Sequence, residues 1–424
     1  MRSNEQSSTA VTNSPGTGLL RRWRLLLVLF VLLCTFGIAA RWYLRSQQAT
    51  DLVRARLQAS YGGPLQVATV ELGLGSSSIR GLRLFQAGSQ PSDDPWLVID
   101  EAHMDASLLT LLNGEPASVP VLLTGVVLTL RYDQSGRLLT ELPKPGEKVS
   151  HFPSLSFKSA RVRLLQEGHP DFEIAEIGGQ LHAEGDRLVL TGTATDPAWG
   201  DWAVTGSMDP ITETTTMRMT AARVHLTQAM LSSLPFVPAK VWRQVQCEGD
   251  TPVELVVGSD LLAKKRHYRV NLEPESTKVH ISSINLYADR AHGKVAIEDG
   301  VVKLEKVSGH SADGQIGTSG ILDFHADPCQ LRFSVSAEHL DLSLLPKSWH
   351  LPPTLKGRLS GQAELLVSIA DGKPLTSGDG YGTVTETRIA AVPVRKPIPV
   401  KLHADGKRFH FSPGRQNDRN SSPP

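Results

Sequence analysis

Cysteines and aromatic residues are scarce in this chain. Its 424 residues include three cysteines, and only 6% of the residues are aromatic. Three cysteines allow at most one disulfide and show no paired metal-ligand spacing, which excludes a fold built on disulfides. In an oxidising compartment Cys247 and Cys329 could pair, or they could remain two separate thiols. We predict separate thiols, because the two cysteines occupy non-equivalent positions in the internal repeat described below.

The chain also lacks an excess of either charge. Its 44 basic and 43 acidic residues give a formal net charge of +1. A protein that binds nucleic acid usually presents a strongly basic field, so we predict no nucleic-acid partner. The hydrophobic share of 40% and the charged share of 21% exclude wholesale disorder and allow two or three globular units.

Motifs for catalysis and metal binding are absent as well. The 14 histidines form no His-Glu-x-x-His or His-x-His pattern, and the chain has no Gly-x-Ser-x-Gly elbow and no Walker lysine. His225 and His339 occupy equivalent places in the repeat, where a local hydrogen bond is the expected role. We therefore predict that the protein is not an enzyme and has no catalytic residue, no metal ligand and no cofactor.

An apolar run lies near the N-terminus. Residues 1–20 are rich in Ser, Thr, Asn and Gly and are predicted to be a disordered cytoplasmic tail. Residues 25–40 contain no charge, and Trp42 and Tyr43 extend the run if Arg41 reaches the membrane interface. We predict a transmembrane anchor over residues 21–44. Its representative apolar residues are Leu25, Val28, Phe30, Leu33, Ile38 and Trp42.

A cleaved signal peptide is the alternative interpretation of this run. Gly37-Ile38-Ala39 fits a small-x-small cleavage site. Aromatic residues on both sides of the run, Trp23 and Trp42 among them, are typical of the two interfaces of a membrane and favour the anchor. The short tail favours an inside N-terminus, because a long following domain is translocated largely regardless of its charge. The body from Gln47 onward is then extracytoplasmic.

The rest of the chain is predicted to be mainly β. A short amphipathic helix follows the anchor, with apolar residues at helical spacing up to Leu57 and an end at Gly62-Gly63-Pro64. From Val67 onward the apolar residues recur with period two, which is typical of strands with one apolar face. We expect an elongated, curved antiparallel sheet with a few short helices. The predicted regions are an N-terminal region over residues 45–142, a repeated region over residues 150–415 and a disordered tail over residues 416–424.

Part of the β region is duplicated. At a constant offset of 114, residues 179–238 match residues 293–352 at 12 of 60 positions, and the similarity extends the copies to about 179–257 and 293–367. Each copy is predicted to run several strands into a short helix, over residues 227–234 and 341–345. The apolar face of such a sheet must be covered by a neighbour, by curling or by a ligand. The face that we single out as a candidate lipid groove comprises Leu331, Phe333 and Val335 with their equivalents Met217, Met219 and Ala221.

Several of these features together resemble AsmA-like proteins, which are related to the bridge-like lipid-transfer group. The motifs are Gly81-Leu82-Arg83-Leu84, the segments 107–114 and 127–136, Glu298-Asp299-Gly300, and the segment 340–346. The resemblance covers roughly residues 21–411 and carries over no active-site residue. It implies one inner-membrane helix that holds a periplasmic, β-rich body with an apolar groove.

The function implied by the resemblance is phospholipid transport or outer-membrane assembly in the cell envelope. The expected partners are membrane lipids, bound through phospholipid acyl chains, and envelope proteins. The chain is shorter than the larger members of the family, which puts bridging of the whole envelope by one chain in doubt. The alternative is a structural scaffold of the envelope, whose repeats bury their apolar faces against each other.

Overall fold

A computed structural model describes most of the chain after the predicted anchor. The described residues are 47–414, except 74, 87, 89–92, 107–118, 142–152, 210, 213, 238–241, 244, 261–264, 283–285, 324–328, 350, 352–354, 371–372, 390–391 and 407. The predicted tails, the segment 107–114 and the anchor residues Leu25, Val28, Phe30, Leu33, Ile38 and Trp42 lie outside them. Among the described residues, no helix has both the length and the apolar character that a membrane crossing requires.

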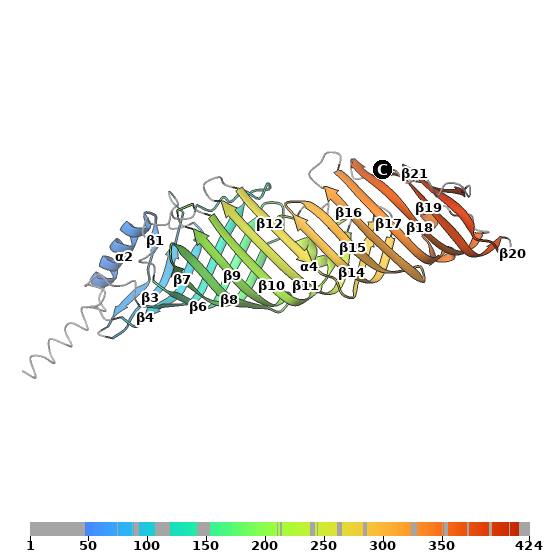
Figure 1. The fold of residues 1–424 in the computed structure, drawn as a ribbon. Coiled ribbons are helices and arrows are strands. Elements are labelled where there is room, and N and C mark those ends of the chain that lie inside the picture. Colours follow the sequence, from blue (N-terminus) through green and yellow to red (C-terminus); the bar gives the residue numbers. More distant parts are fainter. Residues whose placement is uncertain are drawn as a thin grey trace, which may run out of the picture.

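The body is elongated and mainly β, as the period-two alternation predicts (Figure 1). The helix α2 (Gln47–Tyr61) lies at the N-terminal end, and the strands follow one another along the long axis. The first strands are β1 (Leu65–Gln66), β2 (Thr69–Leu72), β3 (Ser77–Leu84), β4 (Leu97–Met104), β5 (Val121–Tyr132), β6 (Leu155–Gln166), β7 (Phe172–Glu184), β8 (Arg187–Asp196), β9 (Gly200–Asp209) and β10 (Thr214–Leu226). The helix α4 (Gln228–Ser233) follows β10.

The remaining strands complete one long curved sheet. They are β11 (Val245–Asp260), β12 (Lys265–Leu272), β13 (Thr277–Ile281), β14 (Leu286–Glu298), β15 (Val301–Ser311), β16 (Gly314–Asp323), β17 (Cys329–Asp341), β18 (Leu355–Ala370), β19 (Lys373–Ile389), β20 (Val392–Val394), β21 (Ile398–Gly406) and β22 (Arg408–Pro413). Two short 3₁₀ helices, η4 (Leu342–Leu344) and η5 (Lys347–Trp349), connect β17 to β18. Figure 1 shows the strands crossing the long axis obliquely.

The strands pair antiparallel with one exception. From β6 to β11 and from β14 to β19 each strand pairs with the next in the chain. Between them, β12 and β13 each pair with β11 on one side and with β14 on the other. Strands β5 and β6 pair in parallel, so the expectation of a purely antiparallel sheet is wrong at this point. Parallel pairing needs a long connection that returns the chain to the starting edge, and the residues between Tyr132 and Leu155 provide it.

The element bounds follow the sequence duplication. Strand β16 is β9 shifted by 114 residues, and β18 is β11 shifted by 110. The predicted helix over residues 227–234 is α4, capped by the Thr227 side chain, which accepts a hydrogen bond from the Met230 N–H. The segment 341–345 forms η4 instead of an α-helix, with Asp341 accepting from the Ser343 N–H at 2.8 Å. Three residues between Asp341 and Leu345 are too few for an α-helical turn to propagate.

The sheet is curved by β-bulges within the strands. Ser159, Glu176, Lys306 and His339 adopt positive φ angles inside strands. The pairing register shifts next to Ser159 in β6, Lys306 in β15 and His339 in β17. A bulge inserts an extra residue on one strand, bends that strand and increases its twist. Bulges in several strands therefore curl one face of the sheet inward.

The apolar core lies on this inner face. One cluster of buried residues runs from Ala194 to Ala404 and includes Leu322, Leu331 and Phe333, whose side chains are at most 1% exposed. The connections between β10 and β11 and between β17 and β18 add Leu231 and Leu345, which are equivalent in the two repeat copies and are both buried. The sheet therefore covers its apolar face partly by curling and partly with its own connections.

A matched pair of glycines tests the packing of the two copies. Gly320 in β16 corresponds to Gly206 in β9. A Cβ at Gly320 would lie 2.2 Å from the Arg332 carbonyl oxygen, whereas the nearest atom to a Cβ at Gly206 would be 3.2 Å away. We expect Gly320→Ala to lower the free energy of unfolding by about 1–3 kcal/mol, because strands β16 and β17 must separate to admit the methyl group. Gly206→Ala should change it by less than about 1 kcal/mol. Urea denaturation of both variants measures the difference, and equal losses would contradict the close approach.

Candidate functional site

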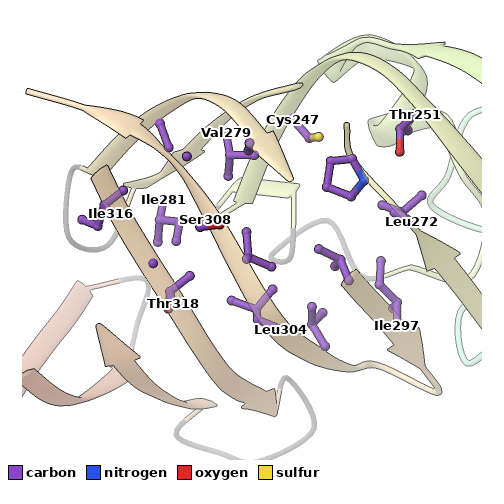
Figure 2. A pocket seen from close by; sticks show the side chains of 18 of the residues that line it. Cys247, Thr251, Leu272, Val279, Ile281, Ile297, Leu304, Ser308, Ile316 and Thr318 are labelled. Atoms are coloured by element: carbon purple, nitrogen blue, oxygen red, sulfur yellow. The ribbon is translucent and has the colours of Figure 1, made fainter. Parts of the chain in front are cut away.

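The inner face of the sheet contains two adjoining apolar compartments. The first lies between β11 and β16 and is lined mainly by aliphatic side chains of β13, β14 and β15 (Figure 2). The second lies between β16 and β22. Both are lined by Ile316 of β16, so they form consecutive parts of one groove. The cavity volume is about 60 Å³ in each compartment, and with the adjoining space that opens to solvent the unfilled region amounts to about 940 Å³ in the first and about 630 Å³ in the second.

Among the described residues that line the groove, none carries a charged side chain in either compartment. In the first, Thr251 donates to the Pro252 carbonyl oxygen at 3.2 Å, and the Ser308 hydroxyl lies 2.8 Å from His292 Nε2. In the second, the Tyr381 hydroxyl lies 3.4 Å from Gln362 Oε1. These hydroxyl groups have partners, whereas the buried Trp242 Nε1 and Thr318 Oγ1 of the first compartment have none among the described residues. Most of the remaining lining is apolar and offers ordered water few of the two to four polar partners that it needs. The groove is therefore suited to an apolar ligand, and burial of such a ligand contributes about 0.8 kcal/mol per CH₂ group.

Each compartment is bounded by the connection of one repeat copy. Trp242, in the connection between β10 and β11, lines the first compartment. Trp349, at the end of η5, lines the second. Both side chains are buried. The connections thus supply one indole ring to each compartment.

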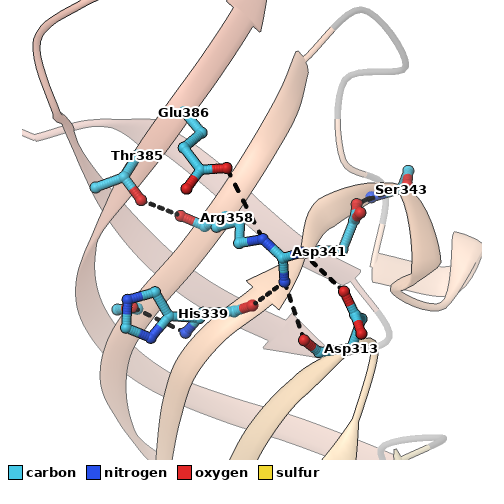
Figure 3. Close-up of polar contacts among 8 residues, drawn as sticks. Asp313, His339, Asp341, Ser343, Arg358, Thr385 and Glu386 are labelled. Carbon is cyan, nitrogen blue, oxygen red and sulfur yellow. Dashed lines mark hydrogen bonds and ion pairs between the residues drawn. The ribbon is translucent and has the colours of Figure 1, made fainter.

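An arginine links strands that contribute to the lining of the second compartment (Figure 3). Arg358 Nη2 donates to Asp313 Oδ2 at 2.7 Å, and its Nη1 donates to the His339 carbonyl oxygen at 3.1 Å. Glu386 Oε2 lies 3.9 Å from Arg358 Nε. The hydrogen bond that Arg358 donates to the Asp313 carboxylate raises the pKa of Arg358. Arg358 thus joins the turn before β16, the bulge in β17 and the strands β18 and β19.

Asp341 lies beside this cluster and holds the start of η4. Its carboxylate accepts hydrogen bonds from the Ser343 hydroxyl at 2.6 Å and from the Ser343 N–H at 2.8 Å. These hydrogen bonds lower the pKa of Asp341. The cap therefore stays ionised at neutral pH and keeps the connection over the apolar face.

The predicted groove face lies within the inner face of the sheet but is largely filled by protein. Leu331, Phe333, Met219 and Ala221 are buried, and Met217 and Val335 are half-buried. All six belong to the same apolar cluster. Of the six, only Val335 lines one of the two compartments.

Sequence reasoning missed the strands that line the first compartment. Val295 and Ile297 of β14 pair with Leu304 and Val302 of β15, and all four point into it. The period-two alternation of these strands is the signal that could have found them. It is the same signal that selected the strand of Phe333, so alternation alone cannot separate an open part of the face from a closed one.

The histidines have local roles in the described part of the chain. His225 Nδ1 lies 2.8 Å from Asp250 Oδ1, and the His339 N–H donates to Ser360 Oγ at 3.0 Å. The hydrogen bonds from His225 and Arg223 lower the pKa of Asp250. No group of three or more His, Cys, Asp or Glu side chains that could hold a metal ion occurs among the residues that the structure describes.

The described cysteines are separate thiols, which confirms the prediction. Cys329 is buried, and its Sγ donates to the Asp323 carbonyl oxygen at 3.1 Å. Cys247 lines the first compartment. Burial raises the pKa of the Cys247 thiol from 9.0 to about 12. The thiol is therefore neutral at physiological pH, as an apolar groove requires.

This pKa predicts slow alkylation of Cys247. At pH 8 the thiolate fraction is about a thousandfold lower than for a thiol with a pKa of 9.0, so iodoacetamide should react about a thousandfold more slowly than in urea. The rate should keep rising up to about pH 12. Because the folded pKa is raised, the stabilising contribution of the neutral thiol is present below pH 9.0 and is lost as the pH rises towards 12. Peptide mass spectrometry, with Cys247→Ser to assign the peptide, measures the rate; full reactivity at pH 8 would contradict burial in the groove.

In comparisons with known proteins, no protein-family model, no curated protein and no solved structure matches this chain.

Proposed function

We propose that this protein binds membrane lipids in the apolar groove and takes part in phospholipid transport or envelope assembly. The observation that carries the proposal is the uncharged lining of the two adjoining compartments. Acyl chains fit such a surface because they need no hydrogen-bond partner. A charged ligand does not, because burial of an unpaired charge is costly.

The proposal places the protein in the inner membrane. The apolar run over residues 21–44 would be the anchor, and the body from Gln47 onward would lie in the periplasm, as the resemblance to AsmA-like proteins implies. A long sheet that carries its apolar face along the molecular axis is the architecture expected for such a body. The partners would be phospholipid acyl chains and other envelope proteins.

A reporter fusion tests the topology. We expect alkaline phosphatase fused after Ala87 to be active, because that enzyme folds only outside the cytoplasm. A cytoplasmic reporter at the same position, such as β-galactosidase, should be inactive. The reverse pattern would overturn the predicted orientation.

The alternative function is a scaffold without lipid transfer. The observation in its favour is the complete burial of Phe333, Leu331 and Leu322 by protein atoms. A groove that is filled at these positions would resemble a core between repeats, and the outer face would then bind an assembly partner.

Photo-crosslinking distinguishes the two functions. A benzoylphenylalanine at Leu304 points into the first compartment, and one at the adjacent Lys303 points away from it. Lipid transport predicts that lipid adducts form at Leu304 in cells and not at Lys303, and that phospholipid is found by mass spectrometry in the detergent-extracted protein. Absence of lipid at Leu304, with protein adducts at Lys303, would instead support the scaffold.

A further inference from the structure

The first compartment contains a buried hydrogen-bond donor that the protein leaves unused. Trp242 Nε1 has no hydrogen-bond partner among the described residues, although its side chain is only 5% exposed. The backbone at Trp242 is tied to α4, because the Trp242 carbonyl oxygen accepts a hydrogen bond of 2.7 Å from Gln228 Nε2. A buried indole N–H usually finds a partner, and leaving it without one costs free energy. The Trp242 side chain lines the wall of the groove, and Nε1 itself is covered by protein atoms.

A second unused polar group lies in the same compartment. Thr318 Oγ1 is buried and has no hydrogen-bond partner within the described part of the chain. Thr318 belongs to β16, whereas Trp242 precedes β11, so the two groups come from opposite ends of the strand series that builds the compartment. Figure 2 shows Thr318 at the end away from Cys247 and Thr251. A hydrogen bond from either group needs an acceptor that the apolar lining does not supply.

We infer that the first compartment binds an acyl ester, with an ester carbonyl oxygen accepting the hydrogen bond of Trp242 Nε1 and the Thr318 hydroxyl serving a second ester oxygen. The inference rests on the proposed lipid-binding function and specifies its ligand. A phosphate or free carboxylate does not fit, because no described residue that lines the compartment is a cation that could compensate a buried charge. An ester oxygen is a neutral acceptor attached to an acyl chain, so it satisfies the indole while the chain covers the aliphatic walls.

The test compares two phospholipids that differ only in their carbonyl groups. Dipalmitoyl phosphatidylcholine carries two esters, and dihexadecyl phosphatidylcholine carries ethers at the same positions. Each lipid displaces a fluorescent phosphatidylcholine from the detergent-solubilised full chain. We expect the ester lipid to bind about 3- to 10-fold more tightly, which is the usual net effect of a hydrogen bond.

Two conservative variants assign the preference to the unused groups. Trp242→Phe keeps an aromatic ring and removes the N–H, and Thr318→Val keeps the shape and removes the hydroxyl. We expect Trp242→Phe to abolish most of the ester preference by weakening the ester lipid and leaving the ether lipid unchanged, and Thr318→Val to reduce the preference by a smaller factor. Loss of affinity for both lipids equally would indicate a packing role and would contradict the inference.

The outcomes separate the inference from the function on which it rests. Equal binding of the two lipids by the unmodified protein overturns the inference, and a water molecule would then be the partner of Trp242, while lipid binding stands. If neither lipid displaces the probe and no lipid adduct forms at Leu304, both proposals fail. The comparison in the unmodified chain remains decisive even if a variant does not fold.

Discussion

Phe333→Glu is expected to unfold the second repeat copy. Phe333 is 0% exposed and lies between Gly320 of β16 and Leu365 of β18. Removal of the ring by Phe333→Ala should cost about 3–5 kcal/mol. The glutamate adds the penalty for a buried charge without a partner, so the loss should be comparable to the whole stability of a domain, about 5–15 kcal/mol. The expected results are a lower yield and loss of the thermal transition of this copy.

A variant on the opposite face of the same strand controls for the charge itself. Ser336 is exposed and pairs with Gln362, so Ser336→Glu should change the melting temperature little. If Phe333→Glu instead keeps the unfolding transition of the unmodified protein and loses bound lipid, the strand lines an open groove and the packing described above is wrong there. The variant therefore distinguishes a closed core from an acyl groove at this position.

Val295→Glu is expected to abolish lipid binding without unfolding the protein. Val295 is half-buried, lines the first compartment and pairs with Leu272 and Leu304. Because Val295 is half-buried and the space that it lines opens to solvent, a longer polar side chain can be accommodated there. A carboxylate among acyl chains costs several kcal/mol, so bound phospholipid should fall by about 100-fold or more. Lipid extraction and mass spectrometry measure the loss.

The next residue in the strand provides the control. Ala296 points away from the compartment and pairs with Lys303, which would stabilise an added carboxylate. We expect Ala296→Glu to retain bound lipid and the melting temperature of the unmodified protein. Equal lipid loss in both variants would show that the compartment is not the binding site. If both variants retained bound lipid, the compartment would likewise not be the binding site.

The strands and the faces of their side chains were predictable because they depend on local periodicity. Alternation in residues 331–337 assigns Leu331 and Phe333 to one face, and both point inward in β17. The duplication was also visible, since it rests on identities at fixed spacing, and β9 and β16 have equivalent bounds. Turn residues such as Asp299-Gly300 determined where one strand ended and the next began.

The parallel pairing of β5 and β6 could not be predicted from local sequence. Alternation is the same in parallel and antiparallel strands, and only the path of the long connection decides which edge the chain reaches. The positions of the bulges could not be predicted from the sequence either, because Glu and Lys ordinarily avoid positive φ and yet adopt it at Glu176 and Lys306. Their conformation is imposed by pairing with two neighbouring strands.

The sequence by itself determined an apolar face along a repeated sheet, and only the tertiary structure decided where that face is filled. Phe333 and Val295 lie in strands with the same alternation, yet one is fully buried and the other borders a compartment. The difference arises from the curvature that the bulges produce and from the connections that carry Trp242 and Trp349 over the face. Both depend on contacts between residues far apart in the chain, and side-chain periodicity within one strand contains no information about such contacts.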